Sequence, residues 1–161
     1  TFTNTYIYKI VNIKETKLAE FNYKLFNNLL PCNKSLVKWK METSDKCLYC
    51  NETEDIIHLL FKCPKNKVIW SAASLVLLHD ITERELILGH GDKITDFIIS
   101  LLAFLIFKYW VLIRKKEIHT NLKYFDITEL AYRFKVYTML EWKCLTTVIN
   151  KIIFTMRAQT N

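Results

Sequence analysis

Three cysteines and a histidine lie close together in the first half of the sequence. Cys47, Cys50, His58 and Cys63 form the pattern C-x2-C-x7-H-x4-C inside a polar, turn-rich segment. Two cysteines separated by two residues fit a tight turn that directs both sulfurs toward one point, and a histidine with a further cysteine completes a tetrahedral N/S site. Three thiolates and one imidazole leave no open position for water. The spacing therefore predicts one closed, structural Zn2+ site.

The residues around the last ligand agree with this prediction. We expect His58 on a short helix over residues 56–61, and on an unbroken helix Cys63 would point about 140° away from it. Pro64 disfavours the α conformation for the residue before it, so Cys63 can turn back toward the metal. The alternative is a set of buried free cysteines and a core histidine. It fits poorly, because four ligands within 17 residues lie where little else would hold the chain.

The remaining cysteines and histidines show no second site by spacing. Cys32 is predicted to be a free thiol at a helix end, and Cys144 a buried, inert thiol in the last helix. His79, His90 and His119 have no partner at ligand spacing, and a loop position explains His90 best.

No catalytic arrangement stands out. The chain shows no Ser-His-Asp, Cys-His or paired-carboxylate pattern by spacing. Asp92 and Asp96 with Lys93 resemble a metal-dependent nuclease only faintly, because the lysine lies between the acids and no buried strand carries them. We therefore expect a non-catalytic domain.

The elements that must position the zinc ligands are predicted to be helices. Half of the 161 residues are hydrophobic (51%) and 14% are aromatic, which excludes a disordered tail. With only two glycines and two prolines, a sandwich, barrel or Gly-rich phosphate loop is excluded as well. The length fits one domain or two small ones. The chain begins with Thr and shows no signal peptide, so we expect a piece of a longer protein.

Hydrophobic periodicity predicts an amphipathic helix over residues 16–30, ended by Pro31. Asn33 is expected to cap a second short helix whose Leu36, Val37 and Trp39 face inward. Residues 6–13 could be a strand or an extended arm. Further helical patterns cover residues 65–78 and 82–88.

The two longest patterns lie in the second half. Residues 97–113 are almost wholly apolar, at the lower edge of membrane-spanning length. Lys108 and a weak polar stripe favour a central core helix instead. Asp126 with Glu129 predicts a capping-box start for a last helix of about 30 residues. The expected fold is mostly α. We expect residues 1–78 to form a helical hairpin plus the CCHC zinc finger (Cys47 to Pro64, called the finger below). Residues 79–161 are expected to form a helical part that packs on the first part as one domain.

Two segments resemble a known family. FNYKLFNNLLPCNKSLVKW (Phe21 to Trp39) and CLYCNETEDIIHLLFKCP (Cys47 to Pro64) are similar to the zinc-binding domain C-terminal to the reverse transcriptase in LINE-type (non-LTR) retrotransposon polyproteins. The shared features before the finger are two helices separated by a proline. Within it they are a Glu-Thr dipeptide before the helix, a His-Leu pair and a Cys-Pro end, and an aromatic residue, Trp70, lies in the next helix. The resemblance is specific over residues 17–71.

The resemblance implies a non-catalytic module of an RNA-directed DNA polymerase polyprotein. Such a module would bind template RNA or target DNA beside the polymerase during target-primed reverse transcription. It implies RNA, DNA and the reverse transcriptase domain as partners, with no membrane and no small-molecule substrate. It also implies a nuclear location, and cytoplasmic assembly is left open as an alternative. The seven residues between Cys50 and His58 differ from the shorter retroviral knuckle, so base insertion in that manner is not implied.

Charge is consistent with a polyanionic partner. The formal net charge is +7, and most of it lies in residues 108–161. A solvated face on an ordinary basic protein explains the charge equally well. Candidate nucleic-acid contacts surround the finger: Lys34, Lys38, Lys40, Tyr49, Lys62, Lys65 and Lys67. A second group is Arg133, Lys143 and Lys151 in the last helix. The alternative function is a structural protein-interaction module, in which the apolar helix docks on the polymerase.

Overall fold

The computed structural model describes Ile13, residues 15–115 and residues 126–160, and most of these are helical. No strand occurs in these ranges, which contain an isolated antiparallel bridge between Lys46 and Thr53. The mostly helical fold is therefore confirmed. The prediction for residues 6–13 lies outside the described residues except at Ile13. The elements are α2 (Thr16–Phe26), α3 (Asn33–Lys38), η1 (His58–Lys62), η2 (Pro64–Asn66), α4 (Lys67–Leu77), α5 (Glu83–Leu88), α6 (Lys93–Arg114), α7 (Ile127–Arg133), η3 (Val136–Thr138), α8 (Leu140–Cys144) and α9 (Thr146–Thr160).

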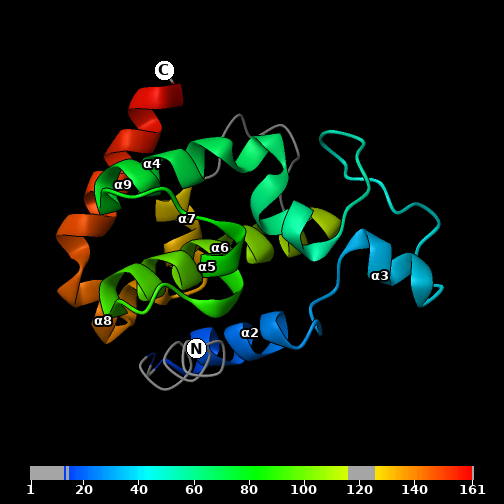
Figure 1. Cartoon of the computed structure of the whole chain (residues 1–161), viewed down its shortest axis with the longest axis horizontal. Coiled ribbons are helices and arrows are strands. Elements are labelled where there is room, and N and C mark those ends of the chain that lie inside the picture. Colours follow the sequence, from blue (N-terminus) through cyan, green and yellow to red (C-terminus); the bar gives the residue numbers. More distant parts are fainter. Residues whose placement is uncertain (1–12, 14, 116–125, 161) are drawn as a thin grey trace.

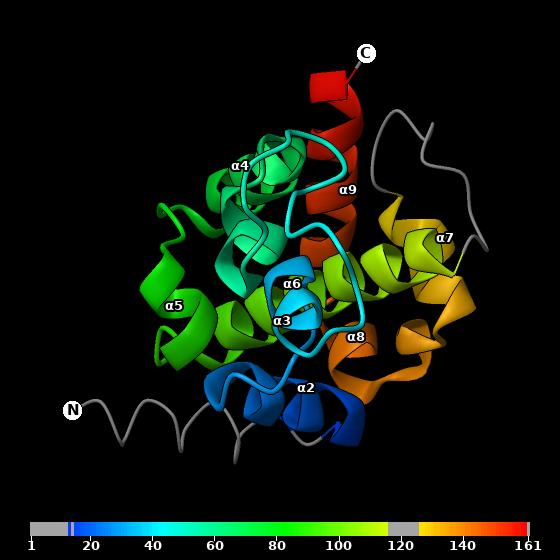
Figure 2. The same ribbon diagram turned by 90° about the vertical axis from the view of Figure 1, so that its right-hand side faces the viewer.

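The apolar segment forms α6, the central helix of the fold (Figures 1 and 2). Helices α2, α4, α5 and α7 all pack against it. By length and composition α6 could cross a membrane, but 89% of its most apolar window is buried in the structure. On the described residues, α6 is thus the core helix that its polar stripe predicts.

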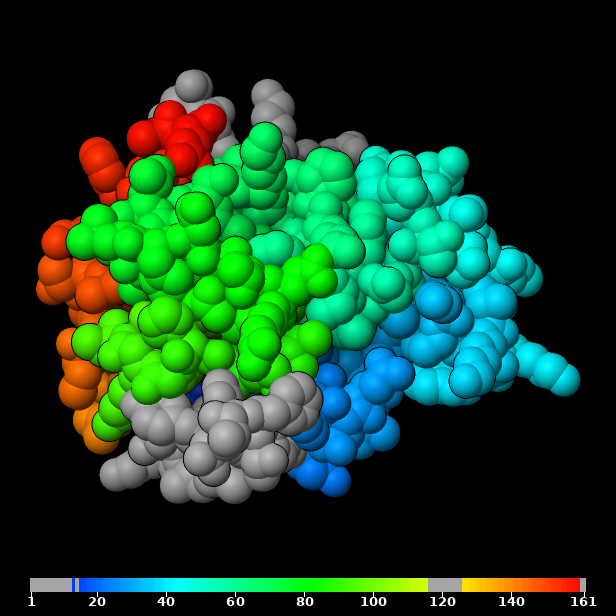
Figure 3. All heavy atoms as spheres, viewed as in Figure 1, coloured from blue at the N-terminus to red at the C-terminus, as the bar shows by residue number. Residues whose placement is uncertain are grey.

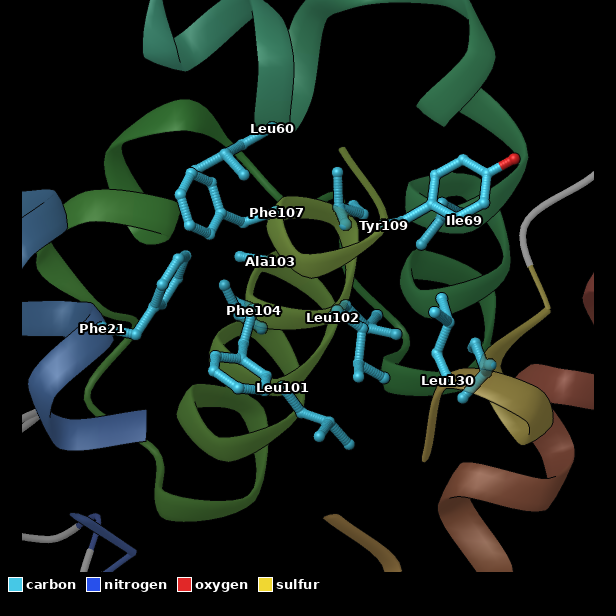
Figure 4. Close-up of a cluster of buried hydrophobic side chains, with 14 of the residues drawn as sticks. Phe21, Leu60, Ile69, Leu101, Leu102, Ala103, Phe104, Phe107, Tyr109 and Leu130 are labelled. Atoms are coloured by element: carbon cyan, nitrogen blue, oxygen red, sulfur yellow. The ribbon is translucent and has the colours of Figure 1, made fainter. Parts of the chain in front are cut away.

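The core around α6 is built from side chains of several helices (Figure 4). Phe21 of α2 meets Phe104 edge to face, with ring centroids 5.8 Å apart, and lies 5.9 Å from Phe107. Leu60 of η1 and Leu130 of α7 reach the same cluster from other sides. Burial of these aromatic and aliphatic surfaces is the main favourable term for the fold.

The last helical region is interrupted, so the expected continuous helix of about 30 residues is wrong. The cap is confirmed: the Asp126 carboxylate accepts from the backbone N–H groups of Thr128 and Glu129 at 2.9 and 3.2 Å. The helix then breaks at Lys135, which has φ 57°, and at the extended Met139. A straight helix of that length would span about 45 Å. The breaks instead allow α7 to pack on α6 and α9 to pack along α4.

Two details of the N-terminal hairpin also differ from expectation. Helix α2 ends at Phe26 because Asn28 takes a left-handed conformation, which leaves Leu29 exposed. Cys32, not Asn33, is the cap residue of α3, and Asn33 is its first helical residue. Leu36 is buried as expected, but the Trp39 side chain is 48% exposed. Trp39 caps the C-terminus of α3, just before Lys40 turns the chain with φ 61°.

Helix α3 and the turn-rich segment 39–55 form one end of the molecule, opposite α8 and α9 (Figure 1). In the space-filling view this segment makes up the projecting end (Figure 3). Residues 39–55 contribute little to the hydrophobic core. Among the residues that the structure describes, Cys47 is the only buried apolar residue from this segment. This end of the molecule therefore needs another source of stability.

Candidate metal centre

A tight turn holds the first two cysteines. The Cys47 N–H donates to the Glu52 carbonyl at 2.7 Å, and the Asn51 N–H donates to the Cys47 carbonyl at 3.1 Å. Asn51 takes φ 62°, a conformation that asparagine tolerates better than most residues. The Tyr49 N–H lies 3.4 Å from the Cys47 Sγ, so the turn directs a backbone donor at this sulfur. Such a donor stabilises a thiolate.

A π-helix presents the other two ligands. Asp55 Oδ1 accepts from the His58 N–H at 2.7 Å at the start of η1. The Cys63 N–H donates to the His58 carbonyl at 2.9 Å, five residues apart as in a π-turn. This wide turn brings Cys63 back over His58, which an α-helix would not do. Cys63 itself is extended, with φ −59° and ψ 131°, as expected before Pro64.

The four side chains converge on one point. The sulfurs of Cys47 and Cys63 are 3.8 Å apart, and Cys50 Sγ lies 3.2 Å from His58 Nε2. All four ligand atoms lie within 4.8 Å of one another. Tetrahedral zinc with Zn–S bonds of about 2.3 Å separates two sulfurs by about 3.8 Å. The cluster therefore fits one structural Zn2+, and its four ligands close the coordination sphere.

The thiols of Cys47 and Cys63 share one proton. The pKa of Cys47 is lowered to about 4, chiefly because the Cys63 thiol donates a hydrogen bond to its sulfur. The same hydrogen bond and burial raise the pKa of Cys63, which holds the shared proton. Cys63 would lose this proton on binding zinc, because a metal-bound cysteine is a thiolate.

A buried polar network attaches the finger to the core. The Glu54 carboxylate accepts from the Asn33 N–H at 2.9 Å and from the Trp110 indole N–H at 3.1 Å. Asn33 Nδ2 donates to the Lys46 carbonyl at 2.8 Å, and Asn33 Oδ1 accepts from Arg114 Nη1 at 2.6 Å. Burial raises the pKa of Glu54. These residues connect the turn that carries Cys47 and Cys50 with α3 and with the C-terminal end of α6.

No pattern in the sequence predicts this network. Glu54 stands in a polar turn, where an acid is ordinarily solvated, and Trp110 follows 56 residues later. No local spacing relates the two residues. A weak signal was the long apolar helix itself, because a buried tryptophan usually needs a partner for its N–H.

The candidate nucleic-acid contacts around the finger fall into two groups. Lys65 Nζ lies over the Tyr49 ring, 3.9 Å from its centroid, and 5.4 Å from that of Tyr109. One face of Tyr49 is thus covered, and burial lowers the pKa of Lys65. Lys62 forms an ion pair with Glu83 at 3.1 Å. The remaining lysines are exposed and make no ion pair within the part of the chain that the structure describes: Lys34, Lys38, Lys40 and Lys67.

The second basic group lies away from the finger. Lys143 on α8 and Lys151 on α9 are exposed, and both helices lie at the opposite end from α3 (Figure 1). Arg133 Nη2 lies 4.0 Å from Glu129 one helical turn earlier. The structure therefore presents two separate basic surfaces rather than one.

Three expectations about other side chains need correction or lie outside the structure. Cys144 is exposed rather than buried, because it ends α8, a short helix that has no buried residue. His79 and His90 do have a shared partner, Glu85, because the loops on both sides of α5 fold back on it. His119 lies outside the described residues. Cys32 is a free thiol at a helix end, as expected, and is buried.

Comparison with known families agrees with the geometry of the finger. A family model described as zinc-binding in reverse transcriptase matches residues 2–70. The match includes all four ligands, and it extends further toward the N-terminus than the residues that carried the resemblance. Neither curated proteins nor solved structures gave a match to the chain. Residues 2–70 are therefore similar to a zinc-binding segment that accompanies reverse transcriptases and is not their catalytic domain.

Proposed function

We propose that this chain is a nucleic-acid-binding domain of a LINE-type (non-LTR) retrotransposon polyprotein, C-terminal to its reverse transcriptase. One observation carries the proposal: the segment similar to zinc-binding regions of reverse transcriptases contains a complete, converging set of zinc ligands. In this role the domain positions template RNA or target DNA for target-primed reverse transcription. The polymerase chemistry belongs to another part of the polyprotein.

Phosphate attraction must come from side chains around the metal rather than from the metal itself. A Zn2+ with three thiolates carries a net negative charge, so it repels phosphate. The net charge of the whole chain is +7. Lys34 and Lys38 lie on α3, Lys40 follows its C-terminal cap, and Lys67 begins α4, four residues after the last ligand. In the proposed complex these four exposed lysines contact phosphates and release counterions.

The proposal also specifies where the domain works. Its partners are RNA, DNA and the reverse transcriptase of the same polyprotein, and it acts in the nucleus. These statements about partners and location follow from the family resemblance.

Paired substitutions test the proposed surface. Lys38→Ala with Lys40→Ala removes two charges beside the finger, and Lys143→Ala with Lys151→Ala removes two charges from α8 and α9. Binding to single-stranded RNA and DNA is measured as a function of salt. We expect the first pair to lower affinity and to reduce the slope of log affinity against log salt by about 0.7 for each lost phosphate contact. The second pair is the matched control.

Two results would contradict the proposed surface. If both pairs match wild type in affinity and slope, neither basic surface binds nucleic acid. If only the second pair weakens binding, the contact lies on α8 and α9 instead. Zinc content and helicity must stay unchanged in all variants, since none of the substituted side chains is a ligand or part of the core.

A protein-interaction module is the second candidate, in a revised form. Docking through the apolar helix does not fit the structure, because α6 is buried. Three large apolar side chains are nevertheless exposed in and beside the finger: Trp39, Met41 and Leu48 are 48, 69 and 62% exposed. Their replacement by serine should abolish docking on a reverse transcriptase, with little dependence on salt. Nucleic-acid binding that depends steeply on salt and survives these substitutions would favour the first proposal.

A further inference from the structure

Two histidines and a glutamate converge at the opposite end of α4 from the zinc ligands. His79 Nε2 lies 2.8 Å from Glu85 Oε2, and His90 Nδ1 lies 3.0 Å from the same oxygen. The three ligand atoms all lie within 4.8 Å of one another. We propose that His79, Glu85 and His90 form a second metal site, which binds a borderline divalent transition metal such as Zn2+. The proposal is independent of any nucleic-acid function.

The loop after α4 fixes the position of His79. Helix α4 ends at Leu78, which takes the left-handed φ of 62°. The His79 N–H then donates to the Ser74 carbonyl, and the Ile81 N–H donates to Ser74 Oγ, each at 3.2 Å. Ile81 is buried in the core. The backbone that carries His79 is therefore held at both ends.

Glu85 is oriented by the cap of its own helix. The Thr82 hydroxyl accepts from the Glu85 N–H at 3.3 Å and donates to Glu85 Oε1 at 3.2 Å. The first bond is an ordinary N-cap contact, and the second occupies one oxygen of the carboxylate. The other oxygen, Oε2, is the one that faces both histidines. Outer hydrogen bonds of this kind orient the ligands of protein metal sites.

His90 is placed by a turn that a buried aspartate secures. Asp96 is 1% exposed, and its two carboxylate oxygens accept from the N–H groups of His90 and Gly91 at 2.6 and 3.0 Å. Gly89 takes φ 90°, and a Cβ there would lie 3.0 Å from Asp96 Oδ1. Only glycine fits this approach without strain. All three groups thus stand on backbone that the fold holds in place.

The donor set is suited to a metal with an open coordination position. Two imidazole nitrogens and one carboxylate oxygen are the protein ligands of many zinc sites that keep a water as their fourth ligand. The side chains of His79, Glu85 and His90 are 26, 14 and 42% exposed, so an ion can enter from solvent. This site differs from the finger, whose four ligands leave no position open.

Metal binding should change the arrangement of the two rings. In the structure the imidazoles of His79 and His90 stack, with centroids 4.4 Å apart and planes 23° from parallel. The lone pairs of two stacked rings do not converge well on one ion. Binding should therefore rotate His90, the more exposed of the two, out of the stack. NMR signals of both rings report this change directly.

The test is the zinc stoichiometry of the complete chain, purified without a histidine tag. Equilibrium dialysis against Zn2+ with elemental analysis, and calorimetric titration of protein that holds one zinc, measure the second equivalent. We expect two equivalents for wild type, and one for Glu85→Gln and for His79→Ala with His90→Ala. Thr82→Ala should lower the affinity for the second zinc ion by about 10-fold, because it removes the hydroxyl that orients Glu85.

Matched controls locate the second ion. Glu83→Gln removes the same charge from the same helix, but the Glu83 carboxylate faces Lys62, so two equivalents should remain. Cys50→Ser should lose the finger zinc and keep the zinc bound by His79, Glu85 and His90. The proposal is overturned if wild type binds one equivalent, which would make the cluster a hydrogen-bonded group only. It is also overturned if the second equivalent survives His79→Ala with His90→Ala, or is lost in His119→Asn.

Discussion

The Trp110 indole N–H donates to the Glu54 carboxylate at 3.1 Å, across 56 residues of sequence. The same oxygen accepts from the Asn33 N–H, so one buried carboxylate joins α3, the metal turn and the central helix. Glu54 is only 2% exposed, and these two donors offset part of the cost of burying its charge. The metal ties the finger together internally, while this carboxylate fixes the finger to the rest of the domain.

Substitutions of Glu54 should separate the role of its hydrogen bonds from that of its charge. Glu54→Ala leaves the N–H groups of Asn33 and Trp110 without their acceptor, which should cost about 1–3 kcal/mol for each unpaired donor. Glu54→Gln keeps an acceptor oxygen of the same shape and should change the free energy of unfolding far less. Denaturant unfolding at fixed free zinc measures both. Equal destabilisation by Ala and Gln would contradict this account.

The charge of Glu54 predicts a specific pH dependence. Burial raises its pKa above the ordinary value of 4.5. Between these two pKa values the native state therefore binds more protons than the unfolded state, and the free energy of unfolding falls as pH rises. The advantage of wild type over Glu54→Gln should be largest below pH 4.5 and decline as pH rises through the native pKa. The difference between the two proteins cancels zinc release at low pH, which is common to both.

Removal of the finger metal should unfold the end of the molecule that contains α3. Cys50→Ser deletes one of four ligands, and structural zinc supplies about 10 kcal/mol to small metal domains. We expect loss of this zinc and of hydrogen-exchange protection in residues 33–63. Cys144→Ser is the matched control, because Cys144 is exposed and far from the cluster. A metal-free domain with native protection would contradict the role given to the metal.

Central burial of α6 predicts that a charge there is not tolerated. Leu102 is 2% exposed, and an unpaired carboxylate at this depth costs several kcal/mol, so Leu102→Asp should unfold the domain. Leu75→Asp places the same group on α4, where the side chain is 61% exposed, and should leave the fold intact. Circular dichroism and thermal unfolding compare the two. Similar melting of both variants would contradict the position of α6.

Lys65 and Lys67 should have opposite roles although they are neighbours. Lys65 packs over Tyr49 and Tyr109, so Lys65→Ala should lower stability by about 1–2 kcal/mol and change the salt dependence of RNA binding little. Lys67 is exposed, so Lys67→Ala should spare stability and reduce the salt slope. Thermal unfolding and salt-dependent binding measure both variants. The reverse pattern would reassign the phosphate contact to Lys65.

The sequence by itself determined the features that depend on neighbours along the chain. Cys47, Cys50, His58 and Cys63 lie within 17 residues, so local turns suffice to bring them together around zinc. The mostly helical fold follows in the same way from apolar periodicity and from the scarcity of glycine and proline. Asp126 as a helix cap is another local feature, since its partners are two and three residues away.

Only the tertiary structure decided the features whose partners are distant or whose backbone is shaped by packing. Glu54 contacts Trp110, 56 residues away, because helices and loops fold over α6 in one particular arrangement. His79 and His90 are only six and five residues from Glu85, but they meet it because the buried Ile81 and Asp96 hold the loops on both sides of α5. The breaks at Lys135 and Met139 arise for the same reason. A straight helix satisfies local propensity, but burial of Val136 and Met139 against the core favours a bent one. Local pattern carries no information about such contacts, because their free energy comes from surfaces that meet only in the folded chain.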